Sequence, residues 1–112
     1  MDLSHEVRGN HLVVSLSGRM DVHLASEVEN QLGALMKAHP DKHILLDLSD
    51  VEYMSSSGLR VFVSSMRTLR ERNLNLMLCN LSPAVRKVFE VVELMDMFDI
   101  YESQEEALAA SS

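Results

Sequence analysis

The sequence predicts a small α/β domain with a mostly parallel or mixed sheet, and three observations carry this prediction. The chain has 112 residues, a length that suits one hydrophobic core. Strand-like and helix-like segments alternate along it, and parallel strands need such helical crossovers. The run Ile44–Leu48 is nearly continuously apolar, as in a central strand covered on both faces. We therefore expect one domain over residues 1–112, with about five strands, about four helices and frayed ends near 1–3 and 110–112.

The first part of the chain has the pattern of a hairpin followed by a helix. Gly9-Asn10 separates the strand-like segments Ser4–Arg8 and His11–Ser17, as the two-residue turn of an antiparallel hairpin does. From about Val22 to Ala38, apolar residues recur every three or four positions, the spacing of an amphipathic helix. Pro40 is expected to end this helix before the central strand begins.

The rest of the chain repeats the strand and helix patterns. A short connection over Ser49–Met54 is expected to lead into a second helix that begins at the serines 55–57, since serine is a favoured helix cap. The later elements are a strand over Leu74–Cys79, a helix capped at Ser82-Pro83, a strand over Phe98–Tyr101 and a short helix from the Ser103–Glu106 capping box.

Composition excludes several classes of function. The chain carries 10 basic and 17 acidic residues, a net charge of −7, which disfavours nucleic acid as a partner. Neither an export signal nor a membrane-inserting segment is recognisable, because charges interrupt every apolar run. The single cysteine cannot form an internal disulfide, which is typical of a cytoplasmic protein.

Catalytic and metal-binding chemistry find little support in the residue pattern. Cys79 follows an apolar strand with no basic neighbour, so we expect a packed thiol. The histidines at 5, 11, 23, 39 and 43 are scattered, which favours surface positions over a metal site. Asp21 and Asp47 could form a carboxylate pair, but no nucleophile or base accompanies them. We therefore expect neither an enzyme nor a bound metal or cofactor.

The informative segment is Ser55–Leu59, where a buried strand gives way to a helix. Free N–H groups at a helix start favour an anion, and a serine there can present its hydroxyl. Three interpretations follow from the residues alone. The serines form a simple helix cap, one of them carries a covalent phosphate, or the turn binds a free anion.

Taken in order, five segments resemble the STAS domain, in particular the stand-alone bacterial anti-sigma-factor antagonists. They are Gly18–Asp21, Leu46–Val51, Ser55–Leu59, Asn80–Pro83 and Phe98–Tyr101. No single segment is specific, but their order and spacing cover nearly the whole chain. The resemblance implies an α/β fold of the kind that the apolar spacing predicts.

The resemblance also implies which residues carry function. Ser57, beside a glycine, aligns with the phosphorylated serine of the family, with Ser56 as the weaker alternative. The implied partner-binding residues are Asp21, Ser55, Ser56, Ser57, Gly58, Leu59 and Arg60. A side chain at Gly58 is expected to damage the turn or the contact with a closely approaching partner, and to weaken binding more than stability. Ser55 stands where the family usually has aspartate, which indicates an altered partner or kinase preference or, as the weaker alternative, loss of phosphorylation.

The implied function is a switch between protein partners. The unphosphorylated domain would bind a serine kinase that is also an anti-sigma factor and so free a sigma factor. Phosphorylation of Ser57 would end that binding, and a serine phosphatase would restore it. The alternative from the same family is a STAS subunit that docks to a membrane transport assembly, because fold alone does not separate the two.

Overall fold

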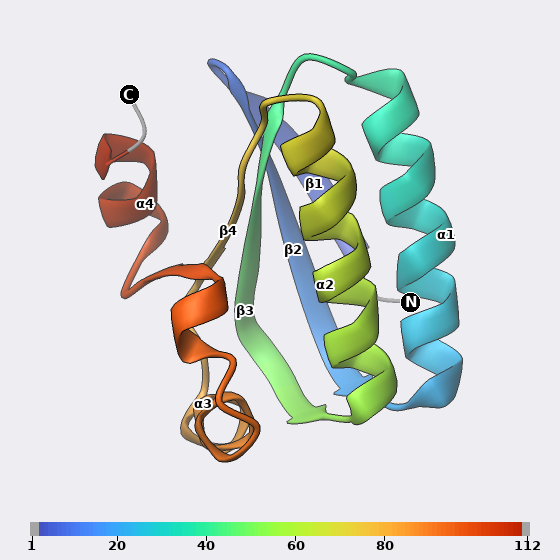
Figure 1. The fold of residues 1–112 in the computed structure, drawn as a ribbon, viewed down its shortest axis with the longest axis vertical. Helices are drawn as coiled ribbons and strands as arrows, with labels where there is room; N and C mark the ends of the chain where they lie inside the picture. Colours follow the sequence, from blue (N-terminus) through green and yellow to red (C-terminus); the bar gives the residue numbers. More distant parts are fainter. Residues whose placement is uncertain (1–2, 111–112) are drawn as a thin grey trace.

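The computed structural model describes residues 3–110, which form a five-stranded sheet with helices on both faces (Figure 1). The strands lie in the order β1-β2-β3-β4-β5. Their bounds are β1 Leu3–Arg8, β2 His11–Met20, β3 His43–Met54, β4 Leu76–Cys79 and β5 Asp99–Tyr101. β1 pairs with β2 antiparallel, and the other neighbours pair in parallel. The predicted mixed sheet of five strands is confirmed.

Between residues 3 and 110, three α-helices and one 3-10 turn connect the parallel strands, and a fourth helix follows β5. They are α1 Val22–Ala38, α2 Ser56–Glu71, α3 Pro83–Val91, the 3-10 turn η1 Met95–Met97 and α4 Gln104–Ala110. Among residues 3–110, no helix is long and apolar enough to cross a membrane. Leu3 and Ala110, where fraying was expected, belong to β1 and α4. The rest of the expected fraying falls on residues 1–2 and 111–112, outside the described range.

Strand boundaries differ from the sequence prediction mainly in two places, at the extended ends of β2 and β3 and at the start of β4. The predicted connection Ser49–Met54 is the second half of β3, because β2 continues beside it to Met20. The pairing shifts register twice along this extension, and Gly18 has a φ of +104°, which only glycine adopts readily. At the other boundary, Leu74 lies outside β4 because its N–H donates to the Leu69 carbonyl and completes the end of α2.

The sheet buries two apolar layers of different size. The larger layer lies between the sheet and α1, α2 and α3, and includes Leu12, Leu46, Phe62 and Phe89. The smaller layer lies under α4 on the opposite face and consists of Val13, Leu45, Met77, Cys79 and Ala107. Neighbouring residues of β2 and β3 therefore enter different layers, as the alternation of side chains along a strand requires. The predicted coverage of the central strand on both faces is confirmed.

α1 and α2 run side by side and begin at the same end of the molecule (Figure 1). α1 follows β2 and α2 follows β3, so both helix starts lie at the carboxyl ends of two neighbouring parallel strands. The carboxyl ends of the strands are the edge at which open α/β sheets usually bind ligands.

Candidate functional site

Ser55 ties the end of β2 to the start of α2. Its backbone is extended, and its hydroxyl oxygen accepts a hydrogen bond from the Gly58 N–H at 3.2 Å. The Met20 carbonyl accepts two hydrogen bonds from Ser55, one from the N–H at 3.1 Å and one from the hydroxyl. A serine can donate and accept at once, whereas an ionised aspartate only accepts. The Ser55 hydroxyl therefore makes a hydrogen bond to β2 that an ionised aspartate side chain at this position could not make.

The next two serines differ in exposure. Ser56 is exposed, whereas Ser57 is half-buried and lines a groove between α1 and α2. The Ser57 hydroxyl makes no hydrogen bond to another residue between 3 and 110. A modification of the Ser57 hydroxyl would therefore break no hydrogen bond among the described residues.

Gly58 and Leu59 lie in the interior rather than on the surface. A Cβ atom on Gly58 would lie 2.6 Å from the Met54 sulfur and 3.2 Å from the Met20 Cβ. Leu59 is 6% exposed. Two methionines of the domain itself fill the space beside Gly58, so of the two effects expected of a side chain there, the structure supports damage to the turn. Both residues pack the start of α2 against the core.

The groove beside Ser57 has a volume of about 160 Å³ and is formed by the N-terminal halves of α1 and α2. Arg60, one helical turn after Ser57, is exposed and lines it. The α1 side contributes residues that the sequence analysis did not assign to a site: Val22, Ala25, Ser26 and Glu29. Val22 is 66% exposed. The one sequence signal for this side of the groove was an apolar residue, Val22, at the predicted start of a helix.

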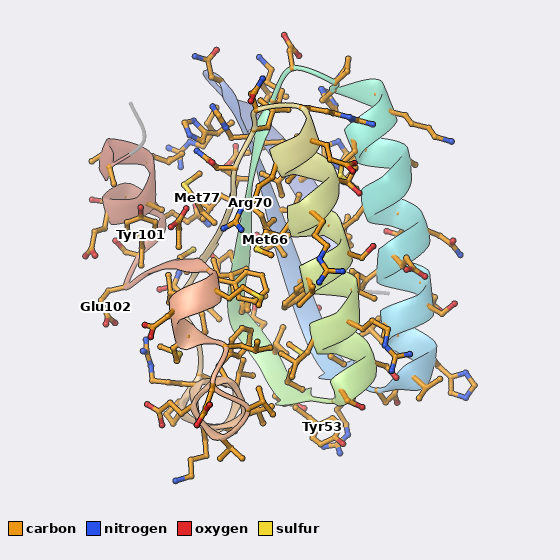
Figure 2. The ribbon with its side chains drawn as sticks, in the orientation of Figure 1. Tyr53, Met66, Arg70, Met77, Tyr101 and Glu102 are labelled. Carbon is orange, nitrogen blue, oxygen red and sulfur yellow. The ribbon has the colours of Figure 1, made fainter. Side chains whose placement is uncertain are left out.

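Asp21 caps α1 at the same end of the molecule. Its carboxylate accepts a hydrogen bond from the Leu24 N–H at 2.9 Å, and its side chain is exposed. Beside it, the Arg19 guanidinium lies 4.6 Å from the centre of the Tyr53 ring, within the range of a cation–π contact. Figure 2 shows Tyr53 at this end of the sheet. The exposed side chains of Arg19, Asp21 and Tyr53 thus lie at the end of the sheet where α1 and α2 begin.

Comparison with known proteins identifies the family. The family model described as STAS domain matches residues 2–107. The chain belongs to the STAS domain family. BtrV of Bordetella bronchiseptica is 34% identical, covering 98% of this chain and 94% of BtrV. The anti-sigma-B factor antagonist of Bacillus subtilis is 32% identical, covering 89% of this chain and 92% of the relative.

Solved structures agree with the fold. SpoIIAA, an anti-sigma factor antagonist, superimposes in its unphosphorylated form with a TM-score of 0.82 at 24% identity, covering 97% of this chain and 95% of SpoIIAA. The phosphorylated form of Bacillus SpoIIAA gives a TM-score of 0.73 at 24% identity, covering 98% and 99% of the two chains. The predicted STAS fold is confirmed.

A second polar cluster of this STAS domain lies on the α4 face. The Asp47 carboxylate, 7% exposed, accepts hydrogen bonds from Ser49 N–H at 3.0 Å, Asn80 Nδ2 at 3.3 Å and Gln104 Nε2 at 2.6 Å. Burial alone would raise the pKa of Asp47, but these donors together lower it below its ordinary value. Asp47 pairs with Ser15 partway along β2, whereas Asp21 follows the end of β2, so the carboxylate pair considered from the sequence does not form.

Cys79 is buried beside this cluster, as predicted. Burial, reinforced by the charge of Asp47, raises the pKa of the Cys79 thiol to about 12. A thiol in this setting stays protonated and is a poor nucleophile. The prediction of a packed cysteine is confirmed.

The expectation of surface histidines is wrong for His11. This side chain is 5% exposed, and its ring centroid lies 5.2 Å from that of His43. Burial and the neighbouring His43 lower the pKa of His11. Within residues 3–110, no three His, Cys, Asp or Glu side chains gather in a way that could hold a metal ion.

Proposed function

We propose that this STAS domain is an anti-sigma factor antagonist that switches partners through Ser57. The free form binds a serine kinase that acts as an anti-sigma factor, and phosphorylation of Ser57 ends this binding. A serine phosphatase restores the free form. The observation that carries the proposal is the Ser57 hydroxyl, which lines the groove between α1 and α2 and makes no hydrogen bond to another described residue. The relatives' names support the antagonist role over docking to a membrane transport assembly.

Ser57 is a better acceptor than either neighbouring serine. The Ser55 hydroxyl is engaged with Met20 and Gly58, so modifying it would break the link between β2 and α2. Ser56 is exposed but does not line the groove. A phosphate on Ser57 would stand beside the groove without disturbing any hydrogen bond of the described fold.

The proposed partner surface follows from exposure. Asp21, Ser56, Ser57 and Arg60 contact the partner, together with the exposed Val22. Gly58 and Leu59 hold these residues in place. A phosphate adds a charge of about −1.5 to −2 and three acceptor oxygens. In a groove of about 160 Å³, this group opposes a closely packed partner by volume and charge while the fold stays unchanged.

The proposed role is one of binding, carried out in the cytoplasm, and it requires no cofactor or metal. The family's aspartate is replaced by Ser55, which keeps the cap of α2. The replacement therefore leaves Ser57 available for phosphorylation. It removes a negative charge next to the acceptor, which favours an altered preference for the kinase over a loss of phosphorylation.

The test is phosphosite mapping with the cognate kinase. Incubation of the wild type with kinase and ATP should place phosphate on Ser57. The Ser57→Ala variant should remain unmodified and bind the kinase with or without ATP, while Ser56→Ala should be modified like the wild type. Phosphate found mainly on Ser55 or Ser56, or recovery of transport components instead of a kinase in a native pull-down, would overturn the proposal.

A further inference from the structure

Among the described residues, Arg60 is the one cationic side chain that lines the groove beside Ser57. We propose that Arg60 binds the phosphate carried by Ser57 and holds it in the groove between α1 and α2. This inference rests on the proposed phosphorylation of Ser57. It makes Arg60 a positioning residue that decides where the phosphate lies.

The geometry places the guanidinium within reach of the phosphate. Ser57 and Arg60 are three residues apart on α2 and line the same groove. Side chains at this spacing are neighbours on a helix surface, with Cβ atoms about 5–6 Å apart. A guanidinium can bind two phosphate oxygens at once, and such charged pairs are stronger than neutral hydrogen bonds.

The Arg60 guanidinium has no polar partner in the part of the chain that the structure describes. It is exposed and makes no hydrogen bond or ion pair with another residue between 3 and 110. By contrast, Arg70 on the same helix donates to the Met97 carbonyl at 3.3 Å. Arg60 can therefore turn toward a phosphate without losing a contact of the described fold.

The opposite wall of the groove repels a phosphate. Glu29 of α1 is the other charged residue that lines the groove, and its negative charge opposes a second anion. With Arg60 present, attraction offsets this repulsion and the phosphate stays in the groove. Without it, the phosphate turns toward solvent and leaves the groove more open to a partner.

The proton affinity of the phosphate reports this contact directly. The second pKa of phosphoserine is about 6, and a neighbouring cation lowers it by favouring the doubly charged form. Removing the cation should raise it. Titration followed by phosphorus NMR measures this property at the modified residue, independently of partner binding.

The experiment compares three proteins with phosphoserine incorporated at position 57 during translation: the wild-type background, Arg60→Gln and Arg67→Gln. Because the phosphate is installed directly, no variant depends on the kinase. We expect the phosphate pKa to rise by about 0.5 in Arg60→Gln, a value scaled down for exposure. Arg67→Gln should leave it unchanged, because Arg67 lies ten residues from Ser57, roughly 15 Å along the helix axis.

A second readout concerns the partner. The phosphorylated Arg60→Gln protein should retain more kinase binding than the phosphorylated wild type, each taken relative to its unphosphorylated form. An unchanged phosphate pKa in Arg60→Gln, with circular dichroism showing an intact fold, would overturn this inference and leave the proposed function standing. Kinase-catalysed phosphate at another serine would overturn the proposed function and would not alter the NMR result.

Discussion

Two strand-to-helix junctions of this domain are built in the same way. At the β3–α2 junction Ser55 caps the helix and donates to the Met20 carbonyl of β2. At the β4–α3 junction Ser82 caps the helix and donates to the Val51 carbonyl of β3 at 3.1 Å. In each case the serine joins a helix start to the neighbouring strand. The common construction indicates that the cap serine has the same structural role at both junctions.

The two junctions differ at the positions after the cap. The second helical residue is Ser57 in α2 and Ala84 in α3, and the third is Gly58 in α2 and Val85 in α3. The Val85 side chain is fully buried in the core. At Gly58, which has no side chain, Met20 and Met54 fill the corresponding space. Of these two junctions, only the β3–α2 junction presents a hydroxyl at the second helical position.

The largest expected effect comes from removing the difference at the third position. Gly58→Val forces a branched side chain into space held by Met20 and Met54, and we expect a loss of about 3 kcal/mol in unfolding free energy. Gly33→Val is the matched control, since nothing lies within 4 Å of a Cβ at Gly33. Chemical denaturation measures both. Equal stability of the two variants would show that the space beside Gly58 is not tightly filled.

The second prediction concerns Asp47, which supports the β4–α3 side through Asn80. In Asp47→Asn, an amide N–H₂ replaces an oxygen that faces N–H donors, and we expect a loss of about 1–3 kcal/mol at neutral pH. Asp50→Asn is the control, because Asp50 is exposed. A loss below about 0.5 kcal/mol, typical of a surface change, would contradict the buried network.

The same residue gives a pH dependence of defined sign. The pKa of Asp47 is lowered in the folded state, so its stabilising contribution is present above the ordinary value near 3.8 and is lost as pH falls through the folded value. The free energy of unfolding should therefore fall more steeply with acidification in the wild type than in Asp47→Asn over the range below about pH 4. Parallel curves in this range would contradict the lowered pKa.

The sequence alone predicted the number and order of the strands and α-helices, because apolar spacing and helix caps are local signals, but it did not predict the 3-10 turn η1. It did not predict the length of β3, because residues 49–54 are strand only through pairing with β2 beyond a bulge. Such pairing depends on residues distant in the sequence. His11 was missed for the same reason, since its burial depends on the neighbouring strands of the sheet.

The candidate site was predicted in part. Ser57 and Arg60 were singled out and share one groove. Glu29 and Val22 were not, because only the packing of α1 against α2 brings them to Ser57. The interior position of Gly58 was also hidden, since it depends on the side chains of Met20 and Met54.

A smaller effect tests the common construction of the two junctions. Ser55→Ala and Ser82→Ala each remove a helix cap and a hydrogen bond to a strand carbonyl. We expect each to lower the unfolding free energy by about 1–2 kcal/mol. Thermal denaturation of both variants checks this. A loss confined to one of them would show that the junctions are not equivalent.

The smallest effect is expected at the second helical position. Ser57→Ala and Ala84→Ser exchange the residue types between the junctions, and each should change stability by less than about 0.5 kcal/mol, because neither side chain is buried. The same denaturation assay measures both. A loss above 1 kcal/mol in Ser57→Ala would give Ser57 a structural role.

The central claim is that a phosphate on Ser57 ends partner binding. The most direct measurement is titration of the cognate kinase with the unphosphorylated protein, Ser57→Asp and the phosphorylated protein, at low and high salt. We expect affinity to fall in that order, because one carboxylate carries less charge and volume than phosphate. Salt screens exposed charges over about 8–10 Å, so high salt should recover only part of the binding if volume dominates. Equal affinity of all three forms at both salt concentrations would contradict the claim.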